Sequence, residues 1–234
     1  MKLFNPDSKF MAALTKMADL MWLNILTLAL CFPIITMGAA LTAKDYMCYK
    51  LLKNEETGIT KGFFKSFKQN FKQATAIWLI MLVIIVVGIV DVLFVIGLQG
   101  EGTQIVRSAM FAFFFFIYVG GIMIFPVLAR FDNTVKGTIK TGLHMTVAIL
   151  PRAILMGILY LIPIAVFLFI GIQSPLIPIV IMFGISGPGY LSAMLYRKAF
   201  EQVEAKYYEE HPEMAPETDP VEEAMQAAMK KDEK

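Results

Sequence analysis

The sequence contains little charge: Asp, Glu, Lys and Arg make up only 17% of its 234 residues, whereas 57% are apolar. A soluble domain of this length needs far more charge to cover its surface. The chain also has few residues of the types that bind metals, with two cysteines and two histidines. Cys31 and Cys48 define no disulfide framework, and neither His144 nor His211 has a partner at metal-ligand spacing. We therefore expect a membrane protein without a metal or other cofactor.

Sequence motifs for catalysis are missing too. Gly97, Gly100 and Gly102 lack the lysine and helix that follow the glycines of a phosphate-binding loop. No serine stands in a nucleophile elbow. The sequence therefore predicts no catalytic residues, and an enzyme acting on lipid or glycan is the weakest of the functional hypotheses.

Long apolar runs dominate what is present. A hydrocarbon core of roughly 30 Å takes about 20 apolar residues in a helix. Open strands are excluded in lipid because every backbone group must pair within its own segment. We expect an all-α, polytopic transmembrane helical bundle in residues 1–200. Its predicted spans are residues 20–43, 74–98, 108–129, 153–172 and 176–196.

The formal net charge of +2 hides an asymmetry. Residues 201–234 hold 4 basic and 11 acidic side chains, so the preceding 200 residues are basic. Pro212, Pro216 and Pro220 interrupt this acidic segment. Because such a composition cannot bury a core, we expect a largely flexible acidic tail.

Lysine and arginine cluster in the connections after the first, third and fifth spans, which predicts a cytoplasmic C-terminus. With five crossings, the N-terminus lies outside. Pro33 interrupts the first span, however, and proline removes a backbone donor and kinks a helix. The alternative is a broken or re-entrant first element, with both termini in the cytoplasm.

The segment 61–73 has the pattern of a basic amphipathic helix. Its phenylalanines fall on one face and its lysines on the other, which is typical of a helix lying in the membrane interface. The alternative, purely structural interpretation is a cytoplasmic connection that leads into the second span. The candidate residues for contact with a lipid or a partner are Lys61, Lys65, Lys68, Lys72, Phe63, Phe67 and Phe71.

Polar residues within or beside the spans are functional candidates. They are Asn24, Asp91 near the external interface, and Arg152 at the entry of the fourth span. The last span contains the small-residue segment 184–189 with Pro188, which predicts either a broken helix around a substrate or a packed kink. Asn24 is a candidate hydrogen-bond partner for that kink.

A short motif occurs twice. Lys61-Gly62-x-x-Lys65-Ser66 precedes the second span, and Lys136-Gly137-x-x-Lys140-Thr141 precedes the fourth. This match is consistent with a parallel internal repeat of the kind found in some transporters. Chance and shared membrane-entry chemistry would produce the same pattern.

Several motifs together resemble the YesL family of bacterial membrane proteins. They are Phe4-Asn5-Pro6, the segments 18–24 and 33–40, and Phe64-Lys65-Ser66-Phe67 continuing to residue 74. The resemblance extends through Phe131-Asp132-Asn133 and Lys136-Gly137-Thr138 and fades after about Phe200. It implies a multi-pass plasma-membrane protein of undetermined biochemical role, whose genes often neighbour those for carbohydrate importers and glycoside-degrading enzymes. It implies no catalytic residues.

The leading hypothesis is therefore a non-enzymatic membrane component that assists or regulates carbohydrate uptake. The expected partners are the lipid bilayer and subunits of a sugar importer, and no nucleic acid is expected. The alternative is a small transporter or channel that uses the possible repeat and the kink of the last span.

Overall fold

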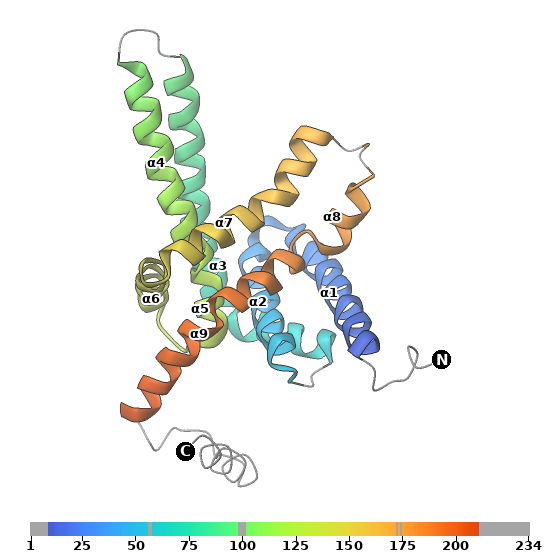
Figure 1. The fold of residues 1–234 in the computed structure, drawn as a ribbon. Helices are drawn as coiled ribbons and strands as arrows, with labels where there is room; N and C mark the ends of the chain where they lie inside the picture. Colours follow the sequence, from blue (N-terminus) through green and yellow to red (C-terminus); the bar gives the residue numbers. More distant parts are fainter. Residues whose placement is uncertain (1–8, 56–57, 98–101, 172, 174, 211–234) are drawn as a thin grey trace, which may run out of the picture. The chain divides into compact units, whose positions relative to one another are not determined.

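A computed structural model describes residues 9–55, 58–97, 102–171, 173 and 175–210 (Figure 1). Most of these residues are helical, and they include no strand, which confirms the all-α fold. The chain divides into two compact units, Met1–Arg197 and Lys198–Lys234. The boundary lies close to the predicted end of the membrane domain at residue 200.

The helices are interrupted by two short segments of other helical type, the 3-10 turn η1 and the π-helical turn η2. In chain order the elements are α1 (Lys9–Cys31), η1 (Ile34–Thr36), α2 (Met37–Lys53), α3 (Ile59–Gly97), α4 (Thr103–Ile122), α5 (Ile124–Arg130), α6 (Val135–Ala148), α7 (Leu150–Ala165), η2 (Val166–Ile170), α8 (Ile177–Phe183) and α9 (Ser186–Glu210).

Several of these helices are long and apolar enough to cross a membrane. By length and composition the candidates are Phe10–Cys31, Ile59–Val95, Thr103–Arg130 and Leu150–Ile170. A fifth candidate consists of α8 and α9, which are bent by 54° at the break between them. The chain is thus a helical membrane protein with four or five candidate spans.

The first predicted span, residues 20–43, is not one helix. α1 ends at Cys31 and α2 begins at Met37. Pro33 has an extended backbone, and its carbonyl oxygen accepts a hydrogen bond from the backbone nitrogen of Thr36 at 3.0 Å. The Thr36 hydroxyl also donates to the carbonyl oxygens of Pro33 and Leu30. The turn therefore satisfies backbone groups that proline leaves without helical partners.

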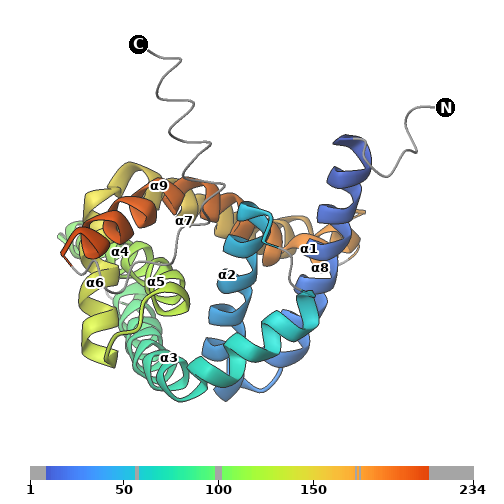
Figure 2. The ribbon, with the colours of Figure 1, turned by 90° about the horizontal axis from the view of Figure 1, so that it is seen from below.

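α2 turns back and packs against α1 in a helical hairpin (Figures 1 and 2). Trp22 on α1 donates a hydrogen bond of 2.8 Å to Thr60 at the start of α3. From Trp22 to Cys31, α1 rises only about 14 Å, or half of a roughly 30 Å hydrocarbon core. The turn itself is apolar, and Phe32 is 91% exposed. The first element is therefore broken at Pro33, and a hairpin that enters and leaves the membrane on one side, the second of the two sequence alternatives, stays a prediction.

Cysteine labelling tests this topology. In a protein lacking Cys31 and Cys48, we introduce Ala13→Cys on α1, Gly58→Cys before α3, or Gln104→Cys on α4, all at exposed positions. In sealed, uniformly oriented vesicles, a membrane-impermeant maleimide is expected to label positions 13 and 58 from the same side. Position 104 is the control. It lies at the start of α4, beyond the far end of α3, and is expected to react from the other side. Labelling of 13 and 58 from opposite sides means that the first element crosses the membrane.

α3 joins two segments that the sequence treats separately. It runs from Ile59 to Gly97 without a break, so the basic segment 61–73 and the second predicted span are one helix of 39 residues. α3 then pairs with α4 in a long hairpin (Figure 1). The second copy of the short motif instead lies on α6, which ends at Ala148 before α7 begins. The two copies thus occupy different helical contexts.

α2 and α3 approach closely at Gly38. A Cβ atom there would lie 2.5 Å from the carbonyl oxygen of Ala74 and 2.6 Å from Cβ of Trp78. The neighbouring Ala39 and Ala74 are buried in a core cluster with side chains of α5. Small residues therefore permit the backbones of α2 and α3 to pack together.

We predict that Gly38→Ala lowers the free energy of unfolding by about 1–3 kcal/mol, because the helices must separate to admit the methyl group. Gly58→Ala is the matched control, since a Cβ at Gly58 has nothing within 4 Å. Thermal unfolding in detergent measures both variants. Equal unfolding temperatures would show that the α2–α3 contact adjusts without cost.

α9 ends at Glu210, the last described residue of the C-terminal unit. Residues 201–210, the first ten of the predicted acidic tail, are thus helical. The remainder of the predicted flexible tail lies outside the described residues.

Candidate functional site: a buried ion pair beside an apolar groove

A buried ion pair lies on α2. The ammonium nitrogen of Lys44 is 2.7 Å from Oδ1 of Asp45, and the residues are 1% and 4% exposed. The same ammonium donates a hydrogen bond of 2.7 Å to the hydroxyl of Tyr160 on α7. Charged groups are this deeply buried only when they are paired. The pair therefore links the N-terminal hairpin to α7.

The surroundings shift the pKa of these groups. Burial alone would lower the pKa of Lys44, but the adjacent Asp45, Tyr160 and Cys48 outweigh it and raise that pKa, so Lys44 keeps its proton. Burial raises the pKa of Asp45, while the ammonium of Lys44 opposes this shift. Burial likewise raises the pKa of the Cys48 thiol to about 12, against the opposing effect of Lys44. Cys48 is therefore an unreactive thiol, whose Sγ lies 3.7 Å from the carbonyl oxygen of Ser186.

The break between α8 and α9 lies against this cluster. A Cβ atom at Gly189, in the first turn of α9, would lie 3.0 Å from Nζ of Lys44 and 3.2 Å from Sγ of Cys48. The absence of a side chain at Gly189 therefore leaves the space that the Lys44 side chain occupies. The predicted kink of the last span is present as the 54° bend between α8 and α9.

Asn24 on α1 holds the break from the other side. Its Oδ1 accepts hydrogen bonds from the backbone nitrogens of Ile185 at 2.9 Å and Ser186 at 2.7 Å. Its Nδ2 donates to the carbonyl oxygen of Ile181 at 2.7 Å. The Ser186 hydroxyl donates in turn to the carbonyl oxygen of Leu20 at 2.8 Å. The contact that the sequence suggested between Asn24 and the kink is thus present, and it satisfies backbone groups that the break leaves without helical partners.

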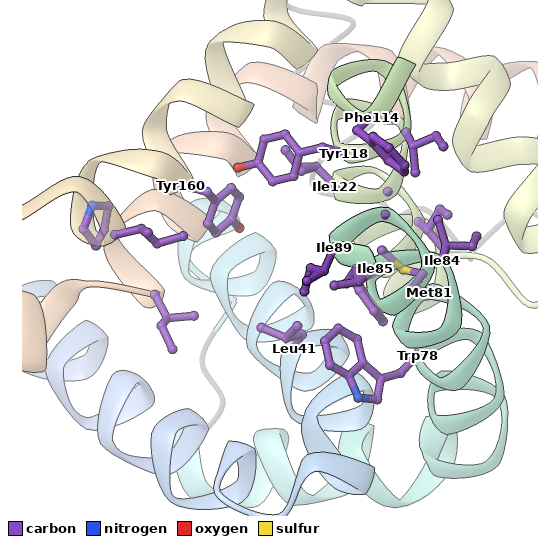
Figure 3. Close-up of a pocket in the computed structure, with 18 of the residues that line it drawn as sticks. Leu41, Trp78, Met81, Ile84, Ile85, Ile89, Phe114, Tyr118, Ile122 and Tyr160 are labelled. Atoms are coloured by element: carbon purple, nitrogen blue, oxygen red, sulfur yellow. The ribbon is translucent and has the colours of Figure 1, made fainter. Parts of the chain in front are cut away.

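A large apolar groove, with a cavity volume of about 1570 Å³, adjoins the ion pair. Its walls come mainly from α3 and α4, and Lys44, Asp45 and Tyr160 line it where α2 meets α7. Figure 3 shows Tyr160 and Leu41 on one side of the groove, with Ile85 and Phe114 on the facing helices. Some of its side chains are exposed, including Phe111 at 76%. The groove is therefore open along part of its length.

The candidate contact helix at the start of α3 is oriented differently from the prediction. Phe63 is completely buried, and Phe67 and Phe71 pack against the core cluster of α2, α3 and α5. The periodicity was correct, but this aromatic face packs largely on protein, with Phe67 and Phe71 only partly exposed. The four lysines are exposed on the other side, as expected, and remain candidates for contact with a lipid or a partner: Lys61, Lys65, Lys68 and Lys72.

The other predicted polar positions lie outside the cluster. Asp91 on α3 and Arg152 on α7 are exposed, and neither lines the groove. Sequence reasoning missed Lys44, Asp45 and Tyr160. The adjacent opposite charges at the end of the first apolar run were the one available signal. Their partner is 116 residues away from Lys44, so no local pattern connects the two.

One comparison with known proteins gives a match, in the N-terminal part of the chain. A family model described as "Protein of unknown function, DUF624" matches residues 20–92, and this family includes YesL-like proteins. The match covers the hairpin from Leu20 onward and α3 through Val92, including Asn24, Lys44 and Asp45. No curated protein and no solved structure matches the chain.

Proposed function

We propose that this chain is a non-enzymatic accessory component of a solute-uptake system in the bacterial plasma membrane, with its C-terminus in the cytoplasm. Carbohydrate is the solute class that the resemblance to the YesL family implies. The match of residues 20–92 to a family of unknown function supports the membrane-protein part of this proposal and leaves the solute open.

The observation that carries an accessory role is the chemistry of the groove. Its walls are almost entirely apolar, and the ion pair that lines it is already bonded to Tyr160. A pathway for a free sugar needs a succession of polar groups to replace the water around its hydroxyls. An open apolar groove instead offers a binding surface within the bilayer.

The exposed lysines at the start of α3 are the proposed contact surface for a partner. Lys61, Lys65, Lys68 and Lys72 are all exposed, whereas the opposite face of the helix is packed on protein. A row of ammonium groups on a helix that is held rigidly by its aromatic face complements an acidic surface of a permease subunit.

Affinity purification tests the proposal. The tagged protein is expected to co-purify with the permease subunit of a sugar importer from native membranes. Lys61→Gln/Lys65→Gln should reduce the recovered permease severalfold. Lys136→Gln/Lys140→Gln on α6 is the matched control, because it removes two exposed lysines at the same spacing. Reproducible recovery without any transport subunit would contradict the accessory role.

A transporter is the second candidate, favoured by the break between α8 and α9 beside Lys44 and Gly189. Broken helices around a buried charged group are a recurrent feature of transporter sites. Purified protein in liposomes is then expected to move a solute, and to lose that activity in Tyr160→Phe. Absence of flux for a panel of sugars, ions and peptides would remove this candidate.

A further inference from the structure

The groove is long enough to hold a lipid chain. Along α3 it is lined from Trp78 to Val95, which corresponds to about 26 Å at 1.5 Å per residue. This distance is most of a roughly 30 Å hydrocarbon core. The wall on α4 includes Phe111 and Phe114, so both sides of the groove are mostly apolar, with Arg107 and Ser108 near the Val95 end. Such a surface binds a long hydrocarbon chain through contact area alone.

The polar end of the groove is a built site. Lys44 and Asp45 are more than nine-tenths buried, and both line the groove together with Tyr160. Lys44 has three N–H donors, of which the contacts with Asp45 and Tyr160 use two. Oδ1 of Asp45 lies 2.7 Å from that ammonium, and a carboxylate oxygen can accept more than one hydrogen bond. The cluster therefore retains capacity both to donate and to accept.

Charge decides which head group fits. The charges of Lys44 and Asp45 cancel, so the cluster attracts neither a phosphate nor a quaternary ammonium group. A hydroxyl group both donates and accepts, and it enters an apolar site at a lower cost than an ion. We propose that the groove binds a lipid with a neutral, hydroxyl-bearing head group, whose chain lies between α3 and α4 and whose hydroxyls bond to Lys44, Asp45 and Tyr160. This inference does not depend on the proposed accessory function.

A partner helix fits the polar end less well. With its side chains a helix is about 10–12 Å wide, and it cannot reach an ion pair that is only 1–4% exposed. A hydroxyl on a small head group can instead approach the pair through Tyr160, which is only partly buried and is bonded to Lys44. The other basic side chain on the groove, Arg107, is near the opposite end, where its guanidinium lies 3.5 Å from the carbonyl oxygen of Val95. An anionic phospholipid bound there is the competing lipid arrangement.

The two tryptophans of the chain provide the assay. Trp78 lines the groove, whereas Trp22 lies on α1 and does not. Trp22→Phe therefore leaves a reporter in the groove, and Trp78→Phe leaves one outside it. Each variant is placed in phosphatidylcholine vesicles that contain a small fraction of one lipid with a dibrominated chain. The probes are a monoacylglycerol, a phosphatidylcholine and a phosphatidylglycerol, since bromine quenches tryptophan fluorescence on contact.

We expect the brominated monoacylglycerol to quench Trp78 at mole fractions about fivefold lower than either phospholipid, the preference expected of about one net hydrogen bond. Trp22 should respond equally to all three lipids. Tyr160→Phe removes one hydroxyl with little change of shape and should reduce the preference. Lys44→Met/Asp45→Leu, which removes the charges together, should abolish it.

Equal quenching of Trp78 by the three lipids would overturn the proposal and leave ordinary bilayer lipid in the groove. A preference for phosphatidylglycerol would also overturn it, in favour of a phosphate bound at Arg107. A preference for monoacylglycerol that survives both Tyr160→Phe and Lys44→Met/Asp45→Leu would show that the ion-pair cluster does not select the head group, and would likewise contradict it.

Discussion

Replacing Lys44 with methionine is expected to destabilise the protein by about 3–5 kcal/mol, because it leaves the carboxylate of Asp45 buried without its cation. The ion pair is 2.7 Å long, and its two side chains are 2% and 4% exposed. Methionine has a similar length and fills most of the space of the lysine stem. The expected loss of stability therefore comes mainly from the uncompensated charge of Asp45 and not from a cavity. Unfolding by SDS titration in mixed micelles measures the change in free energy.

Two variants make this prediction specific. Lys44→Met/Asp45→Leu removes both charges and should recover most of the lost stability, since apolar replacement of a whole buried pair is often neutral or stabilising. Lys50→Met on the same helix is the matched control. Its ion pair with Glu55 is longer, at 3.3 Å, and more exposed, so the expected loss is below about 1 kcal/mol. Similar losses for Lys44→Met and Lys50→Met would show that the buried pair is not a stability determinant.

The second large effect is expected at Asn24. Asn24→Leu removes three hydrogen bonds and leaves two backbone N–H groups, of Ile185 and Ser186, without their acceptor. An unsatisfied buried donor costs about 1–3 kcal/mol, so we expect a total loss of about 3–5 kcal/mol. Because these groups lie at the break between α8 and α9, the variant should also loosen that break. Hydrogen exchange of the segment around residues 181–189 measures this directly.

Asn70→Leu is the control for the change of residue type. The Nδ2 atom of Asn70 contacts Ser66 on its own helix, four residues earlier, so its loss disturbs no contact between helices. We expect a stability change below about 1 kcal/mol and unchanged exchange at the break. If Asn24→Leu leaves exchange at residues 181–189 unchanged, Asn24 does not hold the break closed.

Sequence and structure agree best where the physical signal is local. The apolar runs predict helices because a helix satisfies its own backbone in lipid, and the described residues of the predicted spans are mostly helical, with breaks in the first and last. Pro33 correctly predicted the break in the first predicted span, because the loss of its backbone N–H affects only hydrogen bonds within a few residues. Asn24 was identified because a buried amide needs partners and a kink offers them. Both the amide of Asn24 and the glycines and proline of the kink could be recognised in the sequence.

The phenylalanine face of α3 shows what periodicity leaves open. A repeat of apolar residues identifies a buried face but does not distinguish acyl chains from a protein core. Phe63 is completely buried because α2 and α5 complete the core around the start of α3. The decision between lipid and protein thus depends on helices that are far away in the chain.

By itself the sequence determined that this is a helical membrane protein with lysines concentrated in particular connections. Hydropathy and charge can be assigned to each residue without knowledge of its distant neighbours. Only the tertiary structure decided how the elements meet. It turned the first element into a hairpin, brought Tyr160 to Lys44 across 116 residues, and placed an apolar groove beside the resulting neutral cluster. A buried ion pair is tolerable only where distant side chains complete its bonds, and that completion is a property of packing.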